Sequence, residues 1–230
     1  MKAAFSKVEL EADIASRFGT AFKIQEKNAI ATLSSGISEI DALTGGLPRG
    51  AISEIFGPAS SGRTSLTYAM LAYATTHEET CVLVDTNDVF APTVAATAGI
   101  DFTRLLWIRC AGNLEHAFKA ADLLLHAGGF GLVILDLGDV AGKEARRIIS
   151  SWWYRFRRTV EDRPTVMTVI SEEACTRSCA ALTLELQGTA EWSRTSGQQG
   201  NLLRHNAIRI NRQRPISPWR NEGQFRAVNF

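Results

Sequence analysis

The sequence predicts an α/β protein in which a mostly parallel central sheet is flanked by helices. The first reason is a short β-prone segment, residues 51–56, which enters a glycine-bracketed loop and is followed by a helix-compatible run. The second reason is that apolar runs typical of buried strands alternate with helical segments further along the chain. These runs lie at residues 80–85, 105–108, 131–136 and 165–171.

The loop after the first strand has the layout of a phosphate-binding P-loop, G-x-x-x-x-G-K-S/T, with arginine in place of lysine. Its glycines permit close approaches that a Cβ would block, and its N–H groups would point at a phosphate together with the next helix N-terminus. The alternative is a Gly/Ser-rich turn that binds no ligand. The loop consists of Gly57, Pro58, Ala59, Ser60, Ser61, Gly62, Arg63, Thr64 and Ser65.

Arg63 changes what this loop is expected to do. Arginine binds phosphate as a long planar fork, whereas lysine is a compact ammonium. Thr64 follows and supplies the hydroxyl that would reach a nucleotide-bound Mg²⁺. We therefore expect nucleotide binding and leave catalysis in the usual geometry open.

Length and charge limit the classes of partner. The chain has 230 residues and a formal net charge of +1, which suits one α/β domain with a small appendage. A charge this near zero excludes a global basic field for nucleic acid or acidic membranes, so such binding depends on local patches. No apolar run reaches membrane-spanning length, and we expect a cytoplasmic protein without a membrane partner.

The chain is expected to divide into a helical segment at residues 1–29 and a core domain at residues 30–230. Residues 8–22 have apolar positions at helical spacing, which predicts an amphipathic helix that packs on its own domain or docks on a neighbouring subunit. Ser38 is expected to cap a short helix that Gly45 and Gly46 end.

The stretch from Ser34 to Thr64 resembles the RecA family of recombinases. It matches the pattern S-x-G-x-x-x-x-D-x-L-x-G-G-L-P-x-G-x-x-x-E-I-x-G-P-x-S-S-G-K-T except at Arg63. The resemblance implies a RecA-like P-loop NTPase core with antiparallel C-terminal strands, which binds ATP with Mg²⁺. At family spacing, Asp136 at the end of an apolar run is a Walker-B aspartate, which would order water on Mg²⁺ opposite Thr64.

Besides Arg63, three departures from the family pattern concern catalysis and DNA binding. Asn87 stands where the family has the glutamate that activates water, and an amide has no accessible proton-accepting form near neutral pH, so the catalytic residues are unknown. The run Ser171-Glu172-Glu173 replaces a glutamine that senses the γ-phosphate. The family's two mobile DNA-binding loops are nearly absent, and we expect a short helical stretch between Ile170 and the strand at residues 181–186.

Two basic regions are candidates for binding phosphate or a partner. Residues 143–160 predict one polarised helix with an apolar side and a basic side, which is either a solvated face or a surface for DNA or a partner. Its candidate residues are Arg146, Arg147, Tyr154, Arg157 and Arg158. After a strand at residues 206–211, Arg212 and Arg214 match family positions that reach the nucleotide of an adjacent protomer; a solvated basic turn is the alternative.

The resemblance implies a nucleotide-binding protein of DNA repair, recombination or the SOS damage response. The chain is similar to shortened RecA paralogues of the ImuA type, which accompany error-prone polymerases. Its expected partners are single-stranded DNA, repair proteins such as RecA or an error-prone polymerase, and further copies of itself. The departures predict ATP binding with weak or lost hydrolysis; the alternatives are an active DNA-dependent ATPase and recombinase or a nucleotide-free scaffold.

Overall fold

The computed structural model describes residues 31–138, 140, 143–144, 148–193, 202–215 and 221–226, without the side chains of residues 190–193 and 202–206. The expected N-terminal helix lies outside these residues, as do Arg146 and Arg147. No helix in the described part of the chain is both long and apolar enough to cross a membrane.

An eight-stranded sheet organises the described residues, in the order β10-β9-β8-β3-β7-β6-β4-β5. The six strands from β8 to β5 run parallel, whereas β9 is antiparallel to β8 and β10 is antiparallel to β9. This arrangement confirms the predicted fold class. The strands are β3 (Ala51–Phe56), β4 (Cys81–Asp85), β5 (Leu105–Arg109), β6 (Leu132–Leu137), β7 (Val166–Ser171), β8 (Ala180–Ser193), β9 (Leu202–Arg214) and β10 (Glu222–Arg226).

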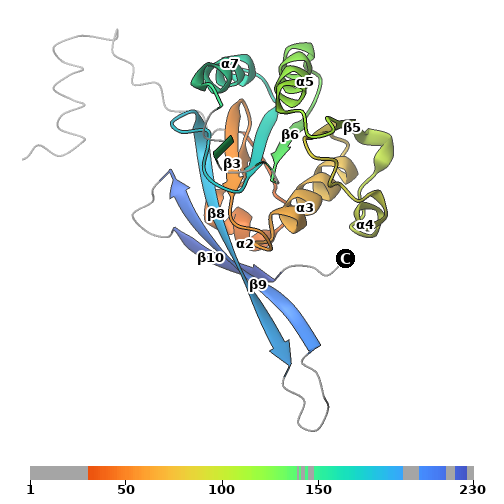
Figure 1. Cartoon of the computed structure of the whole chain (residues 1–230), viewed down its shortest axis with the longest axis vertical. Helices are drawn as coiled ribbons and strands as arrows, with labels where there is room; N and C mark the ends of the chain where they lie inside the picture. Colours follow the sequence, from red (N-terminus) through yellow and green to blue (C-terminus); the bar gives the residue numbers. More distant parts are fainter. Residues whose placement is uncertain are drawn as a thin grey trace, which may run out of the picture. The chain divides into compact units, whose positions relative to one another are not determined.

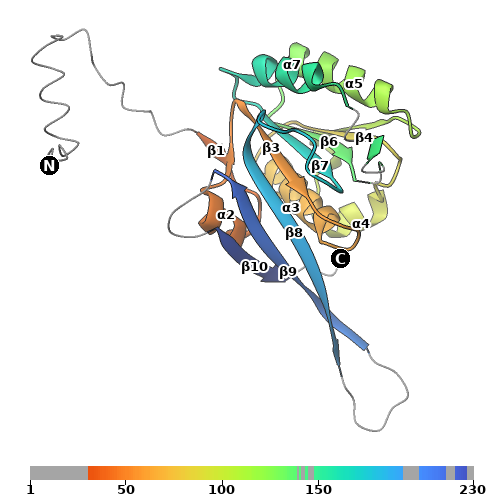
Figure 2. The same ribbon diagram turned by 60° about the vertical axis from the view of Figure 1, so that its left-hand side comes forward.

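Helices cover both faces of the sheet (Figures 1 and 2). One face carries α3 (Arg63–Thr76) and α4 (Pro92–Thr97), and the other carries α5 (Leu114–Ala127) and α7 (Ser150–Val160). Each side has its own buried core, because successive residues of a strand point to opposite faces. In β6, for example, Ile134 packs with α3 and Val133 packs with α5.

Local sequence explains where several helices begin and end. Asn113 caps α5, since its side-chain oxygen accepts a hydrogen bond from the His116 N–H at 3.0 Å. Helix α2 (Ser38–Thr44) ends at Gly45, whose φ of 78° is in the left-handed region, as predicted. Ser38 makes no capping bond: it lies inside the helix, and Ile37 is the N-cap residue. The remaining small elements are β1 (Thr32–Leu33), β2 (Leu47–Pro48) and the 3₁₀ turn η2 (Phe102–Arg104).

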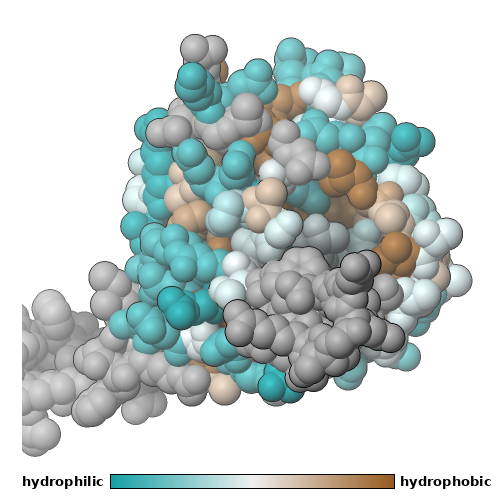
Figure 3. All heavy atoms as spheres, turned by 60° about the horizontal axis from the view of Figure 1, so that its bottom comes forward, coloured by the Kyte–Doolittle hydropathy of each residue, from teal (hydrophilic) through white to brown (hydrophobic). Residues whose placement is uncertain are grey.

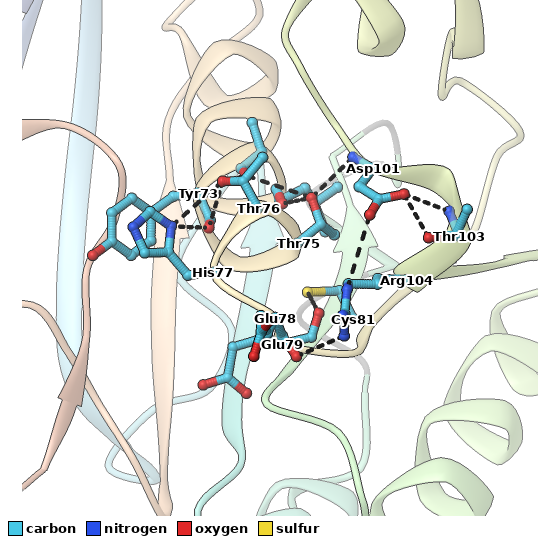
Figure 4. A network of polar contacts seen from close by, with 12 residues as sticks. Tyr73, Thr75, Thr76, His77, Glu78, Glu79, Cys81, Asp101, Thr103 and Arg104 are labelled. Carbon is cyan, nitrogen blue, oxygen red and sulfur yellow. Dashed lines mark hydrogen bonds and ion pairs between the residues drawn. The ribbon is translucent and has the colours of Figure 1, made fainter.

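A polar network fixes the C-terminal end of α3 to the 3₁₀ turn before β5 (Figure 4). Thr75 Oγ1 accepts a hydrogen bond from the Asp101 N–H at 3.0 Å, and Arg104 Nη1 donates to the Glu78 carbonyl at 3.0 Å. Glu79 also pairs with Arg49 at the start of β3 at 2.5 Å. These bonds hold the end of α3 that lies away from the loop at residues 57–62.

Four predicted elements differ from the structure. Residues 143–160 do not form one helix, because Ile149 has an extended backbone with φ −63° and ψ 125° before α7 begins. β5 is a half-buried edge strand rather than a buried one. Residues 172–179 form turns and bends without a helix, and β8 extends to Ser193, well beyond residues 181–186.

Several large apolar side chains are exposed on the described surface. On the face drawn in Figure 3, apolar residues lie in separate areas among hydrophilic ones. The most exposed large apolar side chains include Leu123 and Ile149. Ile149 lines an apolar groove of about 430 Å³ with Leu114, Phe118, Ile148 and Trp152.

Candidate functional site

The phosphate loop, residues 57–62, connects the end of β3 to the start of α3. The Gly57 N–H donates to the Ser171 carbonyl at 3.3 Å, which ties the loop to the end of β7. Gly62 is the N-cap residue of α3, with a φ of 95° and no side chain to cap the first N–H groups. The sequence thus builds a helix start whose N–H groups are suited to an anion.

Glycines in this loop are required by packing as well as by backbone conformation. A Cβ on Gly57 would lie 2.3 Å from the Leu186 carbonyl oxygen, and a Cβ on Gly62 would lie 2.0 Å from Ile208 Cδ1. On β8, a Cβ on Gly188 would lie 2.2 Å from the Ser60 carbonyl oxygen. The loop therefore rests directly on β8 and β9, and its glycines have a structural role whether or not a ligand binds.

Arg63, Thr64 and Asp136 come together at one small cavity of about 90 Å³. Arg63 Nη1 donates to the Gly138 carbonyl at 2.9 Å, just beyond the end of β6. A Cβ at Gly138 would lie 2.9 Å from Asp136 Oδ1 and 3.5 Å from Arg63 Nη1, so the guanidinium and the carboxylate flank the same point. The Gly138 N–H also donates to Asp136 Oδ1 at 2.8 Å.

The site suits a phosphate group better than it suits a hydrated metal. Ser61 Oγ beneath the loop and Thr67 Oγ1 at the cavity are buried, and neither has a hydrogen-bond partner within the described residues. The oxygens of Thr64 and Asp136 are the ligand type that Mg²⁺ prefers. However, the Arg63 guanidinium already stands beside that carboxylate and limits the room for a metal with its waters.

The position expected for a general base carries no carboxylate at the cavity. Asn87 is absent from the cavity lining, to which Val89 and Phe90 contribute instead. Asp85 is buried and accepts hydrogen bonds from the Val89 and Phe90 N–H groups at 3.1 and 3.0 Å, so it holds this loop in place. Asp88 turns to Arg109, with which it pairs at 3.1 Å.

Tyr68 is a cavity residue that no sequence pattern singled out. Its hydroxyl accepts a hydrogen bond from the Ala91 N–H at 3.0 Å, and its ring meets Phe90 edge-on at 5.5 Å. The pKa of this hydroxyl is raised, mainly by burial. The Ala91 hydrogen bond partly offsets this rise, and the Asp136 and Asp85 carboxylates add to it. A tyrosine in an apolar helix run looks like an ordinary core residue, and only the fold shows that it lines the cavity.

Arg212 and Arg214 are both used within their own chain. Arg212 Nη1 donates to the Leu43 carbonyl at 2.6 Å, where it caps the C-terminal end of α2. Arg214 Nη1 donates to the Arg177 carbonyl at 3.0 Å and the Ala180 carbonyl at 3.3 Å. Both residues lie in β9 rather than in a turn after it.

A basic cluster forms around Cys179 from three separate segments. It consists of Arg157 at the end of α7, Arg177 between β7 and β8, and Arg214 in β9. Burial raises the pKa of the Cys179 thiol, and the positive charges of these three arginines lower it. Arg157 and Cys179 line a cavity of about 210 Å³ that also contains Glu161. Arg177 was not among the sequence candidates, since an isolated arginine in a short connection carries no signal.

The other candidates on α7 face a second basic groove or solvent. Arg158 lines a groove of about 530 Å³ with Arg155, Arg163 and His126. Arg155 is committed to Asp122 of α5 through two contacts of 2.6 Å. Tyr154 is exposed. The predicted single basic face is therefore divided, with Arg157 and Arg158 in different grooves.

Comparison with known proteins decides the family. Residues 4–146 match the family model of the RecA N-terminal domain. The chain belongs to the RecA family. It is 37% identical over 108 residues to Protein RecA of Rickettsia massiliae (strain Mtu5), which covers 47% of this chain and 31% of the relative. It is 35% identical over 138 residues to Protein RecA of Ectopseudomonas oleovorans, and this match covers 59% of this chain and 39% of the relative.

The matches span well under half the length of these curated RecA relatives. Among solved structures, the crystal structure of the RadB recombinase is similar with a TM-score of 0.62 and 18% identity, over 86% of this chain and 96% of that one. This likeness supports the fold of this RecA-family chain. Its assignment to shortened paralogues of the ImuA type stays a prediction.

Proposed function

We propose that this RecA-family chain binds ATP at residues 57–65 and acts in DNA repair or recombination. The observation that carries the proposal is the convergence of Arg63, Thr64 and Asp136 on the cavity beside the uncapped start of α3. The N–H groups at the start of α3 would hold phosphate oxygens, and the Arg63 guanidinium would add charge-assisted hydrogen bonds. If Arg63 moved aside, Thr64 and Asp136 would be the oxygen donors for Mg²⁺.

We propose that hydrolysis of ATP is weak or lost. Asn87 supplies no base at the cavity, and Arg63 is bonded to the Gly138 carbonyl rather than projecting freely. The loss of one group that stabilises the transition state commonly lowers a rate by about 10²–10³. Two such changes in one site support turnover close to background.

The proposed macromolecular partners are single-stranded DNA and DNA-repair proteins such as RecA or an error-prone polymerase, in a damage response of the SOS type. The basic cluster of Arg157, Arg177 and Arg214 is the surface best supported for a phosphate backbone, because arginine forks match phosphate geometry. For self-association, Arg212 and Arg214 stay the candidates for a contact in trans, which would require each to exchange its bonds within the chain.

Calorimetric titration with ATP tests nucleotide binding directly. We expect saturable binding to the wild-type chain and binding at least about tenfold weaker to Arg63→Ala, since a charge-assisted hydrogen bond to phosphate is lost. Arg226→Ala, at an exposed position at the end of β10, is the matched control and should bind as the wild type does. Absence of binding to the wild-type chain at high ATP concentration would instead support the nucleotide-free scaffold.

A further inference from the structure

The side chain of Arg63 has a fixed position that its place in the P-loop motif does not predict. It starts at the first residue of α3 and reaches the carbonyl of Gly138, beyond the end of β6. A Cβ on Gly138 would lie 3.5 Å from Arg63 Nη1, an ordinary contact, and 2.9 Å from Asp136 Oδ1, so both side chains lie next to this glycine. The guanidinium is thus held beside the carboxylate that a metal would use.

The volume of the cavity limits what else can stand there. It measures about 90 Å³ with Arg63 in place, and Arg63 lines it together with Thr64, Asp136 and Gly138. Mg²⁺ demands octahedral coordination and usually keeps several of its waters. A phosphate group and a hydrated metal would therefore compete for the same space, whereas a phosphate next to the guanidinium would not.

The charges that line the cavity also favour a phosphate group next to the Arg63 guanidinium. Among the lining residues, Arg63 and Asp136 are the acidic or basic side chains. One guanidinium nitrogen is engaged by the Gly138 carbonyl, and the fork has further N–H donors to offer to phosphate oxygens. A guanidinium stays protonated at all physiological pH values, so its charge is permanent.

We propose that the Arg63 guanidinium takes the place of the divalent cation at the phosphate loop, so that the affinity of this chain for ATP does not depend on Mg²⁺. The inference rests on the proposed nucleotide binding and concerns its ionic requirement. Arginine in place of the family's lysine would then change the ionic requirement for ATP binding as well as impair catalysis. A compact ammonium at this position would not span to Gly138 and fill the space beside Asp136 in the same way.

The test compares the dissociation constant for ATP in excess EDTA and in excess Mg²⁺ for the full chain, measured by calorimetry. For the wild type we expect the two values to agree within about threefold, a difference of less than one decade in affinity. For Arg63→Lys, which frees the space and supplies a smaller cation, we expect binding at least about tenfold tighter with Mg²⁺ than with EDTA. Arg226→Lys, at an exposed position at the end of β10, is the control and should behave as the wild type does.

The possible outcomes distinguish the proposal that the chain binds ATP from the proposal that Arg63 makes this binding independent of Mg²⁺. A wild-type chain that binds ATP only with Mg²⁺ contradicts the role of Arg63 and leaves nucleotide binding standing. A wild-type chain that binds ATP in neither condition overturns both. If Arg63→Lys does not fold, the wild-type comparison alone still decides, because the inference requires strong binding in EDTA.

Discussion

Replacing Gly62 with alanine should destabilise the folded chain even when no nucleotide is present. The added Cβ would lie 2.0 Å from Ile208 Cδ1, 2.8 Å from its Cγ1, and on a residue with a φ of 95°. A left-handed backbone costs an alanine about 1–2 kcal/mol. Overpacking a buried neighbour costs about 1–3 kcal/mol more, so the free energy of unfolding should fall by about 2–5 kcal/mol.

Urea denaturation measures this change, and Gly99→Ala supplies the matched control. Gly99 has a φ of 85°, but nothing lies within 4 Å of the place where its Cβ would stand, so it reports the backbone cost alone. Ile208→Val should partly rescue Gly62→Ala by removing the nearest methyl, with a coupling of about 1 kcal/mol or more between neighbours. If Gly62→Ala and Gly99→Ala destabilise the chain equally, the packing of the loop against β9 is refuted.

Three further predictions follow from the described contacts. Glu54 is buried and accepts hydrogen bonds from the Cys175 and Thr176 N–H groups at 2.6 and 2.8 Å, so Glu54→Gln should lower the unfolding free energy by about 2–4 kcal/mol; the exposed control Glu172→Gln should not. Burial, with Glu79 adding to it, raises the pKa of Cys81 from 9.0 to about 12. The unfolded chain then loses this proton at a lower pH than the folded chain, so the free energy of unfolding should be unaffected by Cys81 below pH 9 and fall by about 1.4 kcal/mol per pH unit from 9 towards 12. If Cys81→Ala loses stability with the same slope in a series of unfolding measurements across this pH range, the prediction is contradicted. The double change Arg157→Ala and Arg177→Ala should weaken binding to single-stranded DNA and reduce the salt slope of log affinity by about 1.4, or about 0.7 per phosphate contact; a fall of the same size in the control Arg109→Ala would argue against this surface.

The sequence predicts the positions of the buried core strands because its signals are local and agree with one another. The apolar runs before Asp85, Asp136 and Ser171 are buried strands in the structure. The break at Ile149 was missed because its apolar pattern continues across it, although the backbone does not. Similarly, the half-buried position of β5 depends on sheet order, which periodicity does not encode.

The arginines show why the site was harder to predict than the fold. Their motif positions identified Arg63, Arg212 and Arg214, but a long flexible side chain finds its partner only in the folded chain. Arg63 extends to Gly138, 75 residues away, and Arg212 extends to Leu43, 169 residues away. Arg177 had no motif at all, and it became a candidate only because the fold brings Arg157 and Arg214 to the same thiol, Cys179.

The central claim is that this RecA-family chain keeps a nucleotide cradle without an efficient hydrolytic centre. The most direct test measures bound ATP and released phosphate in the same samples, with Mg²⁺ present, with and without single-stranded DNA. The structure predicts saturable ATP binding and phosphate release near background in both conditions, since neither Asn87 nor Arg63 is placed to activate water. Robust DNA-stimulated phosphate release that Arg63→Ala abolishes would contradict the claim and establish an active ATPase.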